Sequence, residues 1–157
     1  MNSALSAKLF SLGESRVQET EKKYPFIQNK KGVEIHLIGH LQKNKVRKAV
    51  ELYDVIQTVD SIKLASRISI IAKELNKNQR IYLQVNSGED PLKYGFQSKE
   101  VLSAAIEISQ FSNLEIEGIM MIPPYTPMDK KYRSIYTETR KLRDEILCGS
   151  VSTCKNL

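Results

Sequence analysis

The chain has 157 residues, of which 41% are hydrophobic and 27% charged. These values exclude a fibrous or disordered chain and predict one globular domain, residues 1–157, with a buried core. The formal net charge of +6 makes an anionic partner plausible, but charge alone does not indicate an activity.

Several features predict a cytoplasmic protein. No segment approaches the ~20 apolar residues that span a bilayer, so no membrane partner is expected. The apolar stretch near the N-terminus is interrupted by Lys8 and followed by Gly13, which does not fit a signal peptide. Cys148 and Cys154 have no histidine or second cysteine pair at zinc-ligand spacing, so we interpret them as reduced thiols and predict no metal site.

Five short apolar segments alternate with longer amphipathic segments along the chain. They have the length and β-branched content of strands and lie at Lys8–Gly13, Val33–Gly39, Asp54–Asp60, Arg80–Asn86 and Glu115–Ile122. Because strand and helix patterns alternate, the sequence predicts a parallel sheet with right-handed crossovers.

The clearest helical spacing lies between Ser61 and Leu75, where apolar residues share one face and Asp60 or Ser61 can supply the N-cap oxygen. A second apolar stripe comprises Tyr132, Ile135, Tyr136, Thr139, Leu142 and Ile146. Ser98 can cap another helix, whose predicted inner face is Val101, Leu102, Ala105 and Ile106.

The run QKNKVRKA, residues 42–49, should also begin a helix. Its inner positions are Val46, Ala49 and, one residue further on, Val50, with the cations outward. A solvated helical face is favoured over anion binding. Nucleic-acid recognition would need exposed aromatic residues or a reading helix, and neither is apparent, so a basic anion- or RNA-binding domain is a weaker alternative.

Side-chain parity within the strands bears on the fold class. In the segment RIYLQVN, one face carries Ile81, Leu83 and Val85. In VEIHLIG, one face carries Val33, Ile35 and Leu37. The opposite faces are partly polar. An open doubly wound sheet gives strands that are apolar throughout, whereas a barrel turns polar toward its interior mouth. The parity therefore favours a barrel, although only five of the eight strands of a closed barrel are visible.

Specific motifs follow the predicted strands in a fixed order. They are GESRVQE (residues 13–19), HLIGHLQKNKVR (36–47), TVDS (58–61), QVN (84–86) with KYGF (93–96), and GIMMIPP (118–124). Together they resemble the pyridoxal phosphate homeostasis protein family, the YggS/PROSC group, over about Leu5 to Leu157.

The resemblance implies a partial (β/α)8 TIM-type barrel of the alanine racemase N-terminal domain kind, with about five of eight strand-helix units. It also implies pyridoxal 5'-phosphate as cofactor, held at the barrel mouth, and a homeostatic role without established catalytic turnover. An active racemase or decarboxylase is not predicted, because the sequence offers no pair of residues that could act as the catalytic lysine and the proton donor.

This sequence departs from the family pattern at both ends. Family members begin with a strand that carries the Schiff-base lysine, and they continue into Ser-Met-Gly-Met-Ser and Arg-Ile-Gly stretches that hold the phosphate. The missing strands would be the first, seventh and eighth. The lysines nearest the mouth are Lys43, Lys45 and Lys93, which we expect to be solvated loop residues rather than substitutes.

The resemblance nominates six cavity-lining residues for cofactor binding: Ser15, His36, Gly39, His40, Asn86 and Met120. Four of them have a structural alternative, which for His40 is a loop histidine without a role. His36 can equally be a hydrogen-bonded interior histidine, Asn86 can cap the following turn, and packing is the better expectation for Met120. Ser15 stands where family members usually carry an asparagine, which shortens the polar group.

Two functional hypotheses follow from the resemblance. The chain binds pyridoxal phosphate in a homeostatic role, impaired by the missing lysine and phosphate loops, or it is a non-binding remnant or one half of a split barrel. A five-strand arc would leave two strand edges unpaired and an apolar inner face uncovered, so self-association is also expected.

Overall fold

The computed structural model describes residues 1–27, 32–123 and 129–148. Its strands form one parallel sheet in the order β1-β2-β3-β4-β5, which confirms the predicted parallel arrangement. The strands are β1 Ser11–Glu14, β2 Glu34–Leu37, β3 Val55–Val59, β4 Gln79–Gln84 and β5 Leu114–Met120.

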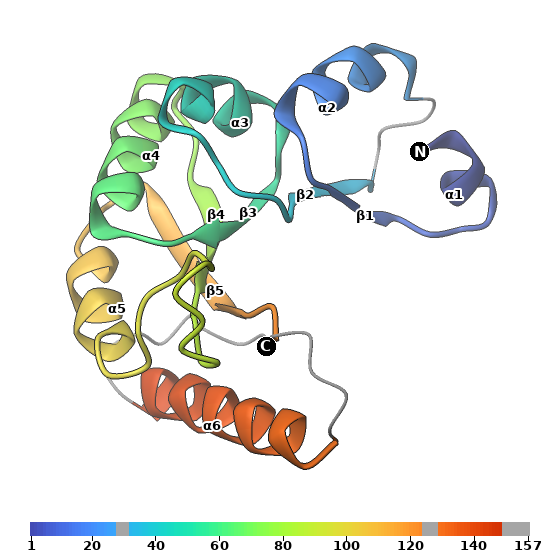
Figure 1. Cartoon of the computed structure of the whole chain (residues 1–157). Helices are drawn as coiled ribbons and strands as arrows, with labels where there is room; N and C mark the ends of the chain where they lie inside the picture. The colour runs from blue at the N-terminus through green and yellow to red at the C-terminus, as the bar shows by residue number, and fades with distance from the viewer. Residues whose placement is uncertain (28–31, 124–128, 149–157) are drawn as a thin grey trace.

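The helices that follow these strands curve around one side of the sheet, so that the chain forms an open arc (Figure 1). They are α2 Val17–Lys23, α3 Val46–Leu52, α4 Ile62–Glu74, α5 Val101–Ser109 and α6 Asp129–Cys148. A short α1, Asn2–Ser6, precedes β1, and two 3-10 turns lie at η1 Tyr24–Phe26 and η2 Lys43–Lys45. The architecture is five successive units of a β/α barrel, as predicted.

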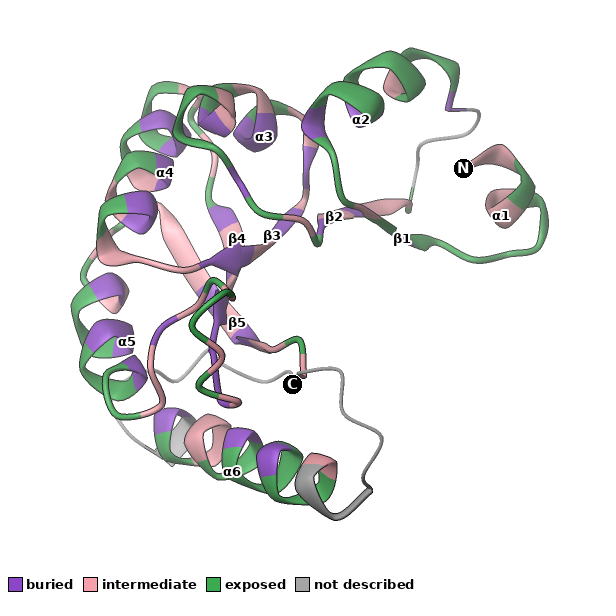
Figure 2. Cartoon of the chain, viewed as in Figure 1, coloured by how far each residue is buried: buried purple, intermediate pink, exposed green. Residues whose placement is uncertain are grey.

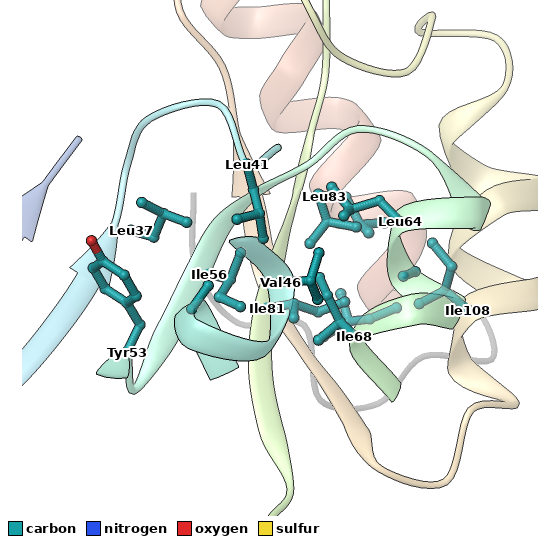
Figure 3. Packing of buried hydrophobic residues seen from close by; sticks show 14 of the residues in the cluster. Leu37, Leu41, Val46, Tyr53, Ile56, Leu64, Ile68, Ile81, Leu83 and Ile108 are labelled. Carbon is teal, nitrogen blue, oxygen red and sulfur yellow. The ribbon is translucent and has the colours of Figure 1, made fainter. Parts of the chain in front are cut away.

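The hydrophobic core lies between the helices and the outer face of the sheet (Figure 2). The strands contribute Ile35, Leu37, Ile56, Ile81 and Leu83, each at most 3% exposed. Figure 3 shows side chains from α3 and α4, among them Val46, Leu64 and Ile68, in the same cluster. The predicted parity of β2 and β4 is therefore confirmed.

The opposite, concave face of the sheet is charged rather than apolar. Glu34 and Arg80 alternate with the buried positions of β2 and β4 and form an ion pair at 2.8 Å. Arg80 also lies 3.4 Å from Glu117 of β5. The expectation of an apolar inner face is therefore wrong for β2 and β4. In these strands the apolar residues of the alternation face the helices.

The first strand begins later than predicted. Lys8 adopts a left-handed backbone conformation with a φ of 61°, which interrupts an extended chain at this point. Leu9 and Phe10 follow at 59% and 52% exposure, and pairing with β2 starts at Ser11. Apolar character alone therefore extended the predicted strand too far toward the N-terminus.

Helix α4 confirms its predicted cap, since the Ser61 hydroxyl accepts from the Leu64 amide at 3.3 Å. The predicted cap of α5 is wrong: Glu100 occupies the N-cap, and the Ser98 hydroxyl has no hydrogen-bond partner among the described residues. Because α5 starts at Val101, its buried face is Val101, Ala104, Ala105 and Ile108.

The face of α5 is therefore rotated from the prediction. Leu102 and Ile106 are 36% and 43% exposed, although both were expected to be buried. Small alanines fill the positions against the neighbouring elements instead. On α6 the predicted stripe is largely confirmed by buried Ile135, Thr139 and Ile146, while Tyr136 is 50% exposed.

Two further sequence predictions concern a membrane-spanning helix and the two cysteines. Within the described ranges, no helix has the length and apolar character needed to cross a membrane. Cys154 and the side chain of Cys148 lie outside the described residues, so their reduced state stays a prediction.

Candidate functional site

The loops that follow β1 to β5 meet at one edge of the sheet, because the carboxyl ends of parallel strands share an edge. We call this edge the mouth. It receives Ser15 after β1, Gly39 and His40 after β2, and Asn86 after β4. In barrels of this type the binding chemistry is built at this edge.

Gly39 holds the first two loops of the mouth together. A Cβ atom at Gly39 would lie 2.1 Å from the backbone oxygen of Ser15, so only glycine permits this close approach. The Thr58 hydroxyl donates to the Gly39 carbonyl at 2.8 Å and fixes the loop to β3. Gly39 therefore has a positional role at the mouth.

Ser15 and His40 line a shared pocket of about 270 Å³ together with Lys45. Ser15 is exposed, and its neighbour Val17 is buried at the start of α2. The structure thus brings two of the nominated residues to the same side of the mouth.

His40 stacks on Tyr94, with ring centroids 3.7 Å apart and an interplanar angle of 13°. Its Nδ1 lies 3.4 Å from a carboxylate oxygen of Asp60, at the end of β3. Tyr94 lies in the loop after β4 and is 56% exposed. This stack joins three strand ends and presents flat aromatic surface at the mouth.

Tyr94 is not one of the six predicted cavity-lining residues, although it lies in the KYGF motif. The signal lies in the next residue, because Gly95 has a φ of 131° that favours glycine and turns the chain back. The Phe96 amide then donates to Gln84, and the Gln84 side-chain amide donates to the Tyr94 carbonyl. Backbone pairing across this loop positions the tyrosine ring.

Asn86 uses its amide within the turn that follows β4. Its Nδ2 donates to the Asp90 carbonyl at 2.8 Å, and its Oδ1 accepts from the Asp90 amide at 3.2 Å. The side chain is 6% exposed. Of the two interpretations offered by the sequence, the structure displays the turn cap.

Lys93 is a half-exposed loop residue that is also hydrogen-bonded at the mouth. Its ammonium donates to the carbonyls of Pro123 at 2.6 Å and Ile122 at 3.3 Å, which ties the loop after β4 to the end of β5. Lys43 is exposed, as predicted, and Lys45 is half-buried. None of the five strands ends in a lysine.

His36 and Met120 lie on the concave face, away from the helices. The Nδ1 atom of His36 is 2.9 Å from the Gln57 side-chain nitrogen, and its Nε2 is 3.6 Å from Glu34. The ring is therefore a hydrogen-bonded interior histidine. Met120 pairs in register with Gln84 at the carboxyl ends of β5 and β4.

Two polar atoms on this side of the sheet, Gln84 Oε1 and His36 Nε2, have no hydrogen-bond partner within the part of the chain that the structure describes. The Gln84 Oε1 atom is buried and accepts no hydrogen bond, and the residue as a whole is 6% exposed. A buried acceptor without a donor is costly and marks a place where a ligand donor or water can bind. It lies beside the loop that carries Tyr94.

The basic run of α3 is largely neutralised within the chain. Arg47 pairs with Glu74 of α4. Lys48 lies 3.2 Å from Glu21 and 2.9 Å from Glu51. Val46, Ala49 and Val50 are buried, as predicted. These ion pairs leave little free charge for an anion on this helix.

No group of three or more metal-ligating side chains occurs in the described ranges. The mouth therefore offers aromatic surface and hydrogen-bonding groups, and its described lysines do not stand at strand ends. Such a set fits a flat, polar aromatic ligand. It does not supply the covalent anchor expected of a lysine that ends a strand.

Comparison with known proteins places these features in context. The family model described as alanine racemase, N-terminal domain, matches residues 3–146. A pyridoxal phosphate homeostasis protein of Synechocystis is 35% identical over 124 residues, which are 79% of this chain and 57% of that protein. The chain thus spans less than two thirds of the length of that relative.

Two solved structures of PipY from Synechococcus elongatus are also similar. The form without PLP has a TM-score of 0.90 and 32% identity, covering 98% of this chain and 71% of that chain. The form with PLP bound has a TM-score of 0.85 and 30% identity, with the same coverage.

Proposed function

This chain belongs to the alanine racemase N-terminal domain family, together with the pyridoxal phosphate homeostasis proteins, and on that premise we propose that it binds pyridoxal 5'-phosphate without catalytic turnover. The proposal places it in cytoplasmic homeostasis of this cofactor. The relatives' names and the PLP-bound PipY structure support the ligand.

The observation that carries the proposal is the stack of His40 on Tyr94 at the mouth. A flat pyridine ring can bind against this surface, and the free acceptor of Gln84 lies beside the same loop. Ser15, Gly39 and Met120 complete the proposed cavity wall, with His36 deeper on the concave face. Asn86 contributes by fixing the loop that carries Tyr94.

The binding proposed for this chain is weak and non-covalent. Bound cofactor of this type is electrophilic at its aldehyde carbon, and a lysine amine must reach that carbon for covalent attachment. Lys93 already donates to two carbonyls, and Lys43 is exposed on η2. The described mouth therefore supplies ring contacts without an amine directed at the ligand, which impairs retention.

Equilibrium dialysis of the full chain against pyridoxal phosphate tests the proposal. We expect saturable binding that weakens about twofold to tenfold in Tyr94→Ala and in His40→Ala, since stacking on one ring contributes ~0.5–1.5 kcal/mol. Tyr136→Ala is the control and should leave binding unchanged, because it changes a tyrosine of α6 that is 50% exposed, close to the 56% of Tyr94. Absence of saturable binding would favour the non-binding alternative.

Borohydride trapping followed by peptide mapping tests the non-covalent character. We expect no lysine to be modified in stoichiometric yield. Stoichiometric modification of Lys43, Lys45 or Lys93 would contradict the proposed impairment and identify a substitute anchor.

We also propose that the chain self-associates through its sheet edges. β1 and β5 each have a single neighbouring strand within the described residues. Such edges present unpaired backbone groups that can pair with another chain. Light scattering should report oligomers, and a sharp monomer peak over a wide concentration range would overturn this expectation.

A further inference from the structure

A second pocket, of about 290 Å³, lies between η2 and the outer surface of α4. It is lined by Lys43, Lys63, Leu64, Ser66, Arg67 and Ile70. Lys63, Arg67 and Ile70 follow one another at helical spacing on α4, so they form one stripe. Lys43 approaches this stripe from the turn before α3. None of these residues belongs to the proposed cofactor wall.

The pocket has an apolar floor beneath a cationic rim. Leu64 is 3% exposed and belongs to the core, whereas Ile70 is 49% exposed at the surface of α4. A half-exposed isoleucine among cations is an apolar contact that the described part of the fold does not cover. The exposed part of the Ile70 side chain makes no contribution to the packing of the barrel arc.

The rim cations also lack partners, in contrast to their neighbours. Lys43, Lys63 and Arg67 have no carboxylate within ion-pair distance among the described residues. On the adjacent helix, Arg47 pairs with Glu74 and Lys48 with Glu21 and Glu51. The pocket therefore gathers uncompensated positive charge around an apolar surface.

We propose that this pocket docks an acidic helical segment of another protein, with an apolar side chain inserted against Ile70 and carboxylates on Lys43, Lys63 and Arg67. Amphipathic helices are recognised in this way, by apolar anchors at helical spacing and complementary flanking charge. The volume is at the lower limit of the ~300–1,000 Å³ of small-molecule sites and suits a side chain better than a cofactor.

The same features disfavour two other occupants. No aromatic residue lines the pocket, so bases of a nucleic acid would find no stacking surface. A second copy of this chain, which the sheet edges are proposed to bind, also carries a net charge of +6 and offers no acidic excess to this cationic rim. The complementary partner is thus a different and acidic protein.

Fluorescence anisotropy with the full chain tests the proposal. The probe is a short fluorescein-labelled synthetic helix with leucines one turn apart flanked by glutamates. A scrambled peptide of equal composition controls for charge alone. We expect the designed helix to bind with an affinity that falls as salt is raised, and the scrambled peptide to bind at least about fivefold more weakly.

Charge-reversal variants locate the site. Lys63→Glu with Arg67→Glu should weaken binding by about tenfold or more, because two attractive contacts become repulsive. Lys22→Glu with Lys141→Glu changes the net charge equally at exposed positions on α2 and α6, outside the pocket, and should cost less than about threefold. Equal weakening by both pairs would overturn the proposal.

Two further substitutions test the apolar floor of the pocket and the one rim cation that lies outside α4. Ile70→Ser should weaken binding about threefold to tenfold, since it removes the apolar contact. Lys43→Ala, on a separate element, should weaken binding about threefold. Circular dichroism checks that each variant is folded. Unchanged binding in both, or displacement of the peptide by a short single-stranded RNA that itself binds more tightly, would refute a protein-docking pocket.

Discussion

On β2, two adjacent side chains face opposite ways and have different surroundings. Leu37 is fully buried beneath the helices, whereas His36 lies on the concave face and contacts Gln57 and Glu34. The same contrast holds along β4, where Ile81 alternates with Arg80. The helix-covered face therefore specifies the fold, and the concave face and the mouth are left free for polar chemistry.

Truncation of each neighbour in turn should separate these roles most clearly. Leu37→Ala removes a fully buried side chain and should lower the free energy of unfolding by about 2–5 kcal/mol. His36→Ala should cost about 1 kcal/mol or less, because its partners lie on a partly solvated face. Urea unfolding followed by circular dichroism measures both.

Equal losses in these two variants would contradict the contrast between the faces. The dependence of the unfolding free energy on urea should stay the same in both variants, since they expose similar surface. A change in that dependence would show that the denatured state, rather than the packing of one face, had been altered.

The next largest effect is expected at the mouth, where Gly39→Ala should cost about 1–3 kcal/mol by forcing the chain away from Ser15. Gly13→Ala is the matched control on β1. Its Cβ atom would meet only the Ile38 side-chain tip, at 3.0 Å, and this tip can move. Thermal unfolding compares them, and equal costs would show that the close approach to Ser15 is not rigid.

Local periodicity explains which parts of the fold could be predicted from the sequence. The alternation in β2 and the helical spacing of α4 report which side is covered, because burial follows the period of the element. The sequence predicts Asp60 or Ser61 as the cap because both directly precede that helix, and the structure selects Ser61. Ser98 was misleading because α5 begins two residues later than a cap at that position requires.

The sequence predicts those residues of the candidate site that directly follow a strand, but not the contacts between residues far apart in the chain. Gly39 and His40 stand at a strand end that periodicity identifies, whereas the contact of His40 with Tyr94 joins residues far apart in the chain. Likewise, the two carbonyls that bind Lys93 come from the segment that follows β5. Such contacts depend on loop geometry and tertiary placement, for which a single sequence carries no periodic signal.

The smallest expected effect concerns the charge on the concave face. Arg80 donates to Glu34 and holds the pKa of that carboxyl below its ordinary value of 4.5, against the opposing effect of burial. A lowered folded-state pKa stabilises the fold above pH 4.5, and this stabilisation is lost as the pH falls through the folded-state pKa. Because the side chain is 46% exposed, we expect at most about 1 kcal/mol.

Glu34→Gln should therefore be less stable than the unmodified chain near neutral pH, and this difference should shrink as the pH is lowered below 4.5. Urea unfolding at a series of pH values measures the difference. The same substitution in an Arg80→Met background completes a double-mutant cycle, in which most of the pH dependence should disappear. Persistence of that dependence would assign the effect to the His36 ring, whose Nε2 atom lies 3.6 Å from Glu34, rather than to the ion pair with Arg80.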